Sequence, residues 1–167
     1  LAGAMATVSR LLEASAITVA IADPASPAVR TSMAAYFDEL ARRFEAGFDP
    51  AVTLPTADEQ FRLPAGLVLL ATLHDRPVGC VGLKLHADGV GEVKRLWVSS
   101  EVRGLGLARR MLGRIEAEGS SRGIHTLRLD TNRALTEAIA LYRALGYREI
   151  EAYNDEPYAH HWFEKRI

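Results

Sequence analysis

The sequence lacks several features that would each point to a particular class of protein. Its 167 residues include one cysteine, Cys80, so no disulfide can form within the chain, and a reducing compartment fits this composition. No segment approaches the roughly 18 uninterrupted apolar residues of a membrane-spanning helix. The first residues show neither the charged region nor the long apolar core of a signal peptide. We therefore expect a cytoplasmic protein with no membrane partner.

An excess of charge of one sign is also missing. Lysine and arginine total 20 and aspartate and glutamate 21, which gives a formal net charge of −1. This balance disfavours nucleic acid as a partner, because binding its phosphates needs a basic surface. The paired histidines His160-His161 invite a metal interpretation, but Cys80 is alone and the other histidines show no ligand spacing. We expect no metal site.

What remains is an average globular composition. Apolar residues make up 49% and charged residues 25% of the chain, and no repeat or low-complexity segment interrupts it. A chain of this length fits one domain with a sizeable core, so we expect a single domain over residues 1–167. Met5 follows Leu1-Ala2-Gly3-Ala4, and we interpret it as an internal start, which leaves residues 1–4 outside the predicted fold.

Apolar periodicity predicts the order of helices and strands. Strands are expected at 17–21, 67–73, 78–85, 90–98, 124–131, 147–153 and 161–167, helices at 28–46, 105–120 and 135–145, and a loop with room for a short helix at 49–64. Turn signals at 74–77 and Asp88-Gly89 predict two hairpins. Because strands and helices do not alternate regularly, the pattern predicts a mixed sheet with helices on both faces.

The segment Arg103–Ala108 is the strongest functional signal. It follows a predicted strand and opens a predicted helix, whose first amides lack intrahelical partners and favour an anion. Gly104 and Gly106 would let a ligand approach the backbone closely, and Arg103 could add a charge-assisted hydrogen bond. The segment predicts pyrophosphate binding, although an ordinary strand-to-helix turn would also use glycines here.

The spacing of the glycines in this segment indicates which class of pyrophosphate ligand it binds. A dinucleotide-binding fingerprint needs Gly or Ala at position 109, where this chain has Arg, and no Gly-Lys-Ser/Thr sequence of a nucleotide-binding P-loop follows. Arg103, Gly106 and Ala108 instead match Arg/Gln-x-x-Gly-x-Gly/Ala, so the segment resembles the signature of the GNAT superfamily of N-acetyltransferases. In that family the loop binds the pyrophosphate of acetyl-coenzyme A.

A second segment carries the same resemblance. Ala138-Ile139-Ala140-Leu141-Tyr142 followed by Gly146-Tyr147 is similar to the second motif of the family, about 30 residues after the first. The resemblance implies a mixed α/β GNAT-type acyl-CoA N-acyltransferase fold, with a central, mixed, largely antiparallel sheet and helices on both faces. It also implies acetyl-CoA as co-substrate and an amine as acceptor.

The resemblance and the chemistry of acetyl transfer suggest roles for individual residues. We assign Tyr142 as the acid that protonates the departing thiolate, since a phenol with a pKa of about 10 can donate to a thiolate of about 8.5. Glu92 is the expected general base, although pairing with Lys94 or Arg95 would explain this residue equally well.

By resemblance, the strand around Glu92 splays at a bulge and offers backbone groups of Leu96 and Val98 to the acetyl-pantetheine. The expected cofactor-binding residues are Leu96, Trp97, Val98, Arg103, Gly104, Leu105, Gly106, Leu107, Ala108, Arg109, Asn132, Ala138 and Tyr142.

By resemblance to the family, the acceptor pocket is expected to be lined by the link joining the last two strands and by the link after the first predicted helix. Its expected residues are Tyr36, Glu39, Asn154, Asp155 and Tyr158. The acceptor would be a small-molecule or peptide amine, acetylated by direct transfer, in a monomer or homodimer. A non-catalytic acyl-CoA sensor or interaction module is the alternative, because a fold does not by itself fix a function.

Overall fold

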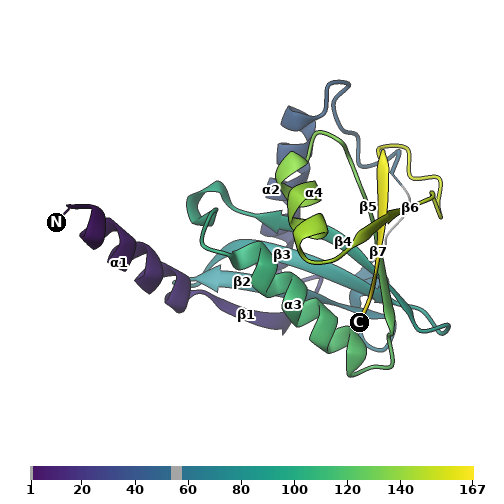
Figure 1. Cartoon of the computed structure of the whole chain (residues 1–167), viewed down its shortest axis with the longest axis horizontal. Helices are drawn as coiled ribbons and strands as arrows, with labels where there is room; N and C mark the ends of the chain where they lie inside the picture. Colours follow the sequence, from purple (N-terminus) through teal and green to yellow (C-terminus); the bar gives the residue numbers. More distant parts are fainter. Residues whose placement is uncertain (1, 54–57) are drawn as a thin grey trace.

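The computed structural model describes residues 2–53 and 58–167, and in these residues seven strands form one sheet (Figure 1). The strands run in the order β1-β2-β3-β4-β5-β7-β6, and all neighbours are antiparallel except β4 and β5. The bounds are β1 Thr18–Ala22, β2 Gly66–Leu73, β3 Arg76–Leu85, β4 Val90–Val98, β5 Thr126–Thr131, β6 Arg148–Ile150 and β7 His161–Arg166. The predicted mixed, largely antiparallel sheet is confirmed.

Helices cover both faces of the sheet. The bounds are α1 Ala2–Ala16, α2 Pro27–Arg43, α3 Leu107–Ser120 and α4 Thr136–Ala144, with short 3-10 helices η1 Asp58–Phe61 and η2 Ser100–Val102. The α3 and α4 helices share the larger core with β2 to β5 and β7, whereas α2 packs with η1 and β2 around the smaller one. No helix in the described part of the chain is long and apolar enough to cross a bilayer.

Local sequence explains where the central elements begin and end. Ser26 caps α2 by accepting a hydrogen bond from the Val29 amide, and Pro27 occupies its first turn. In α3, Met111, Leu112 and Ile115 are fully buried against the sheet, as the helical spacing of these residues predicts. The β4 strand has the predicted bounds, so the turn that follows it lies where the sequence analysis placed it.

Two elements differ from the prediction. Ala2, Gly3 and Ala4, which the sequence analysis excluded from the fold, belong to α1, and this helix extends away from the sheet (Figure 1). Residue 1 lies outside the described residues. Met5, Val8, Leu11 and Leu12 of this helix are exposed, so it lacks the buried face on which a prediction from periodicity depends. The predicted strand 147–153 is reduced to β6 Arg148–Ile150, because the following residues turn toward β5 rather than continue along the sheet. Residues 54–57 of the predicted loop lie outside the described residues.

Candidate functional site

The site begins where β4 and β5 separate. Their parallel pairing runs from Val90 and Thr126 to Glu92 and Arg128, while β4 continues to Val98. On its other side β4 stays paired with β3 but contains a bulge, since Lys94 faces Gly82 and Trp97 faces Cys80. The V-shaped gap between β4 and β5 is thus built into the register of the sheet.

The bulge also changes which side chains share a face of β4. Simple alternation would place the side chains of Glu92, Lys94, Leu96 and Val98 on one face of β4. The extra residue after Lys94 shifts this alternation by one position. Trp97 therefore shares the face of Glu92 and Lys94. Arg95, at the bulge, has a positive φ of 57°, a conformation that costs a non-glycine residue energy and is concentrated at functional sites.

The turn between β4 and α3 has the geometry of an anion cradle. Gly104 and Gly106 both have φ of +77°, and Gly106 is the N-cap of α3. Its carbonyl accepts the first helical hydrogen bond from Arg110 at 3.0 Å, which leaves the first amides of α3 directed outward. No atom lies within 4 Å of the position that a Cβ on Gly106 would take, so space is available beside the backbone.

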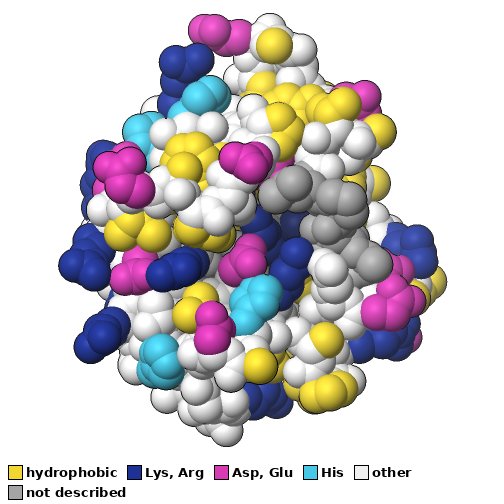
Figure 2. Space-filling view, turned by 90° about the vertical axis from the view of Figure 1, so that its right-hand side faces the viewer, with side chains coloured by type: hydrophobic (Ala, Val, Ile, Leu, Met, Phe, Trp, Pro, Cys, Tyr) yellow, Lys and Arg dark blue, Asp and Glu magenta, His cyan; other side chains and the backbone are white. Residues whose placement is uncertain are grey.

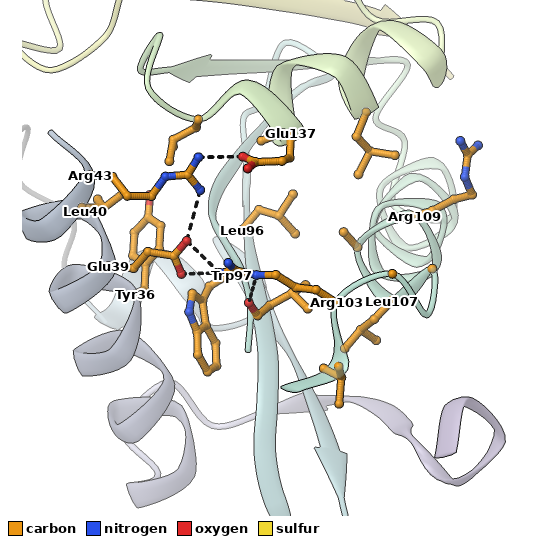
Figure 3. A pocket seen from close by; sticks show the side chains of 18 residues that line it. Tyr36, Glu39, Leu40, Arg43, Leu96, Trp97, Arg103, Leu107, Arg109 and Glu137 are labelled. Atoms are coloured by element: carbon orange, nitrogen blue, oxygen red, sulfur yellow. Dashed lines mark hydrogen bonds and ion pairs between the residues drawn. The ribbon is translucent and has the colours of Figure 1, made fainter. Parts of the chain in front are cut away.

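A first cavity of about 380 Å³ lies against this turn, between α2, β4 and α4 (Figure 3). It is lined by Tyr36, Glu39, Leu40, Arg43, Leu96, Trp97, Val98, Val102, Arg103, Gly104, Gly106, Leu107, Ala108, Arg109, Leu135, Glu137, Ala138 and Leu141. The lining is apolar along β4, and its charged residues lie at the turn and α3, on α2 and at Glu137 of α4. This division suits a ligand with an anionic end and a long, weakly polar arm.

Ion pairs join the walls of the first cavity, from α2 to the turn and from α2 to α4 (Figure 3). Arg103 Nη2 lies 2.7 and 2.6 Å from the two carboxylate oxygens of Glu39, and Arg103 Nε donates to the Val98 carbonyl at 3.2 Å. Arg43 contacts both Glu39, at 3.2 Å, and Glu137, at 2.6 Å. The hydrogen bond from Arg43 lowers the pKa of the Glu137 carboxyl. These contacts link α2, α4 and the turn in one network.

A second cavity of about 440 Å³ adjoins the first along β4, since residues 92–96 line the second and residues 96–98 line the first. It shares Tyr36, Leu40, Leu96, Leu135 and Ala138 with the first, so the two cavities meet beside Leu96. Its charged lining consists of Lys84, Lys94, Arg95, Glu92, Asp130 and Glu156, and its aromatic lining of Tyr36, Phe37, Phe44, Phe48, Tyr142, Tyr153 and Tyr158. Such an arrangement can hold two ligands end to end.

Tyr142 lines the second cavity and is buried. Its side chain is 5% exposed, and its ring centroid lies 5.8 Å from that of Tyr147 and 5.9 Å from that of Phe163. Burial raises the pKa of the Tyr142 phenol well above its usual value, and the nearby Asp130 carboxylate adds to the rise. The phenol therefore holds its proton through the neutral range, as a proton donor must.

Three carboxylates line the second cavity, and two of them, Glu92 on β4 and Asp130 on β5, belong to the strands that border the gap. Glu92 contacts His86 Nε2 at 2.8 Å and Lys94 at 3.5 Å, so the pairing with Lys94 that the sequence analysis left open is present. Asp130, at the end of β5, accepts hydrogen bonds from Lys94 at 2.5 Å and from Asn154 at 3.0 Å. Both carboxylates could take a proton from an amine in this cavity.

The structure brings most of the predicted site residues together. Of the expected cofactor-binding residues, ten line the first cavity, namely Leu96, Trp97, Val98, Arg103, Gly104, Gly106, Leu107, Ala108, Arg109 and Ala138. Asn132 and Tyr142 line the second cavity instead, and Leu105 is in the described lining of neither. The Asn132 amide donates to the Tyr158 carbonyl at 2.8 Å, which holds the β6–β7 connection in place.

The expected acceptor residues are divided between the two cavities. Asn154 and Tyr158 line the second, Tyr36 lines both, and Glu39 lines the first, where it pairs with Arg103. Asp155 is exposed and outside the described lining of both, whereas its neighbour Glu156 lines the second cavity.

Several site residues escaped the sequence analysis. Asp130 follows Leu127 and Leu129, which are buried, so a charged residue at the end of this strand was a usable signal. Lys84 on β3 and Lys94 on β4 lie two positions apart in the register of the hairpin, on the same face of the sheet. Charged residues within these apolar strands were a signal of the same kind. Glu137, Arg43 and Phe48 carried no such signal, because only tertiary packing brings them to the gap.

Comparison with protein families gives one match. The family model described as Acetyltransferase (GNAT) family matches residues 33–147, a range that contains the turn, both sides of the gap and α4. A protein of Azospirillum brasilense named IAA acetyltransferase is 38% identical over 82 residues, which are 48% of this chain and 54% of that protein. The chain spans a little more than half the length of the first curated relatives it matches.

Solved structures share the fold. An acyl-CoA N-acyltransferase from Klebsiella pneumoniae superposes with a TM-score of 0.72 and 27% identity, covering 90% of this chain and 97% of that one. A GNAT family acetyltransferase from Elizabethkingia anophelis, solved with acetyl-CoA bound, gives a TM-score of 0.61 at 16% identity, covering 91% and 99%. The fold of this chain is therefore a known architecture.

Proposed function

The chain belongs to the acetyltransferase (GNAT) family, and from that premise we propose that it moves an acetyl group from acetyl-CoA directly to an amine within a ternary complex. The observation that carries the proposal is the meeting of the two cavities beside Leu96. One side has the anion cradle and the other has the proton-handling groups. A thioester in the first cavity and an amine in the second would approach each other at the gap.

In the proposed binding mode the pyrophosphate lies against the amides of 104–108 and the Arg103 guanidinium. The pantetheine arm follows β4 toward Leu96, as a further strand would, and uses the backbone groups that β5 leaves unpaired. Bound acetyl-CoA in the Elizabethkingia anophelis structure supports this choice of co-substrate.

The reaction proposed for the gap has three steps. Glu92, directly or through a water, takes a proton from the ammonium group so that the amine can attack the thioester carbonyl. A backbone amide of Leu96 or Val98 donates to the oxyanion that develops on that carbonyl. When the tetrahedral intermediate collapses, the carbon–sulfur bond breaks and Tyr142 gives its proton to the thiolate. The nitrogen of the new amide gives up the extra proton that it still carries, through water, to the tyrosinate, and this restores the phenol.

The first test is ligand-induced stabilisation. Acetyl-CoA at 100 times its dissociation constant should add about 2.7 kcal/mol to the free energy of unfolding, a rise in Tm of several degrees, whereas NADH should add nothing. Equal stabilisation by acetyl-CoA and NADH, or no stabilisation by either compound at millimolar concentration, would contradict pyrophosphate binding by this turn.

The second test separates an enzyme from an acyl-CoA sensor. Thiol release from acetyl-CoA is followed with and without a panel of primary amines. Release that depends on the added amine is expected for a transferase. Stabilisation by acetyl-CoA without any amine-dependent release would instead favour the sensor.

A further inference from the structure

One basic side chain of the second cavity forms no ion pair with the residues that the structure describes. Lys84, on β3, pairs in register with Glu92 and lines the cavity with its side chain half buried. Among residues 2–53 and 58–167, no carboxylate lies within ion-pairing distance of its ammonium group. Burial lowers the pKa of Lys84, which means that the charge is partly removed from water without a paired anion.

The other two basic groups of this cavity are already engaged. Lys94 lies 2.5 Å from Asp130 and 3.5 Å from Glu92. Arg95 packs its guanidinium over the rings of Phe37 and Phe61, at 5.8 and 5.1 Å from their centroids. Lys84 is thus the cation of the second cavity that a ligand could neutralise.

An aromatic cluster forms another wall of the same cavity. Phe48 lies at its centre, with ring centroids 5.5 Å from Phe37, 5.8 Å from Phe44 and 4.9 Å from Tyr158. These residues come from α2, the segment after it and the β6–β7 connection, and they offer an apolar surface to a ligand. In the space-filling view of this end of the molecule, hydrophobic side chains lie close to charged side chains of both signs (Figure 2).

We propose that the acceptor is an amino carboxylic acid with an apolar body, whose carboxylate binds Lys84 and whose body packs on the aromatic cluster. The inference rests on the proposed function, because it names the acceptor of that same site. An ammonium–carboxylate contact in a partly dry cavity is a charge-assisted hydrogen bond, and it would relieve the uncompensated burial of Lys84. An amine without the carboxylate would leave that charge unpaired.

The test compares acids with their amides. Phenylalanine and phenylalaninamide, and phenylalanylglycine and its amide, each share an amine and an apolar body and differ in the carboxylate. The wild-type protein should use or bind the acid of at least one pair tenfold or more better than its amide. In Lys84→Met the ratio of kcat/KM for acid over amide should fall at least tenfold, mainly through KM. Lys84→Arg, which keeps the charge, should retain most of the preference.

Calorimetric titration of the same acids and amides into the protein with bound coenzyme A gives an answer that needs no turnover. Preferential binding of an acid that is lost in Lys84→Met supports the assignment. Equal affinity for acid and amide in both pairs, or an equal loss of both in Lys84→Met, overturns it. Absence of thiol release with every amine would contradict the proposed transferase, while the titration would still decide the role of Lys84.

Discussion

Tyr142 combines burial in the core with contact to the second cavity, and each property has a consequence for activity. Because burial raises its pKa, the phenol stays protonated well above neutral pH, and the protonated form is the one that donates. We expect Tyr142→Phe to lower kcat by about 10² or more while the dissociation constant of acetyl-CoA changes little. Single-turnover rates measure the chemical step. An unchanged rate in the Phe variant would remove Tyr142 from the mechanism.

Glu92 and Asp130, the carboxylates that β4 and β5 bring to the second cavity, can be distinguished by their effect on the pH dependence of activity. A base must be deprotonated to act, so activity governed by it falls as pH decreases. We expect Glu92→Gln to abolish the acidic limb of the kcat/KM profile and Asp130→Asn to preserve it. The reverse result would assign the base to Asp130, which lies 2.5 Å from Lys94 on the opposite side of the gap.

Glu39 was expected to bind the acceptor, but it faces the anion cradle and holds Arg103. A pyrophosphate would have to compete with this carboxylate for the guanidinium. A partly exposed ion pair contributes up to about 1 kcal/mol, so we expect Glu39→Gln to tighten coenzyme A binding by up to about fivefold. Glu101→Gln, which removes an exposed partner of Arg76, is the matched control. Weaker binding in Glu39→Gln would mean that the carboxylate positions Arg103 for the ligand.

Among the elements, the turn before α3 depends on backbone conformation rather than on side-chain packing. A Cβ would meet nothing within 4 Å at Gly106 or at Gly113, so neither substitution by alanine causes a clash. Gly106 has a φ of +77°, where alanine costs about 1–2 kcal/mol, whereas Gly113 is inside α3, where alanine gains about 0.5–1 kcal/mol. We expect Gly106→Ala to lower Tm and weaken coenzyme A binding and Gly113→Ala to raise Tm. Equal effects in thermal unfolding would show that the turn does not need its left-handed conformation.

How far the sequence predicts these elements depends on whether the signal is local. The bounds of β4 and the left-handed glycines of the following turn come from alternation and turn chemistry within a few residues, and they were predictable. The α1 helix was not, since its apolar residues are exposed and bury no face. The pairing of Glu39 with Arg103 joins positions 64 residues apart, and no local pattern encodes it.

At the scale of the whole molecule, α2, α4 and the strands on both sides of the gap form two cavities with five shared residues. Direct transfer needs both substrates bound at once, whereas a two-stage route needs a nucleophile on the enzyme. Cys80, the sole cysteine, is completely buried, and burial raises its pKa to about 12, so it offers no thiolate near neutral pH.

We therefore expect initial rates, measured against acetyl-CoA at several fixed amine concentrations, to give intersecting rather than parallel double-reciprocal lines. Cys80→Ala should keep the same pattern and a similar kcat, because among the described residues the thiol makes one hydrogen bond, to the Arg95 carbonyl at 3.6 Å. Parallel lines, together with loss of activity in Cys80→Ala, would require an acetylated enzyme. That outcome would mean that the β3 strand opens during turnover, since a residue with no exposed surface cannot otherwise meet the thioester.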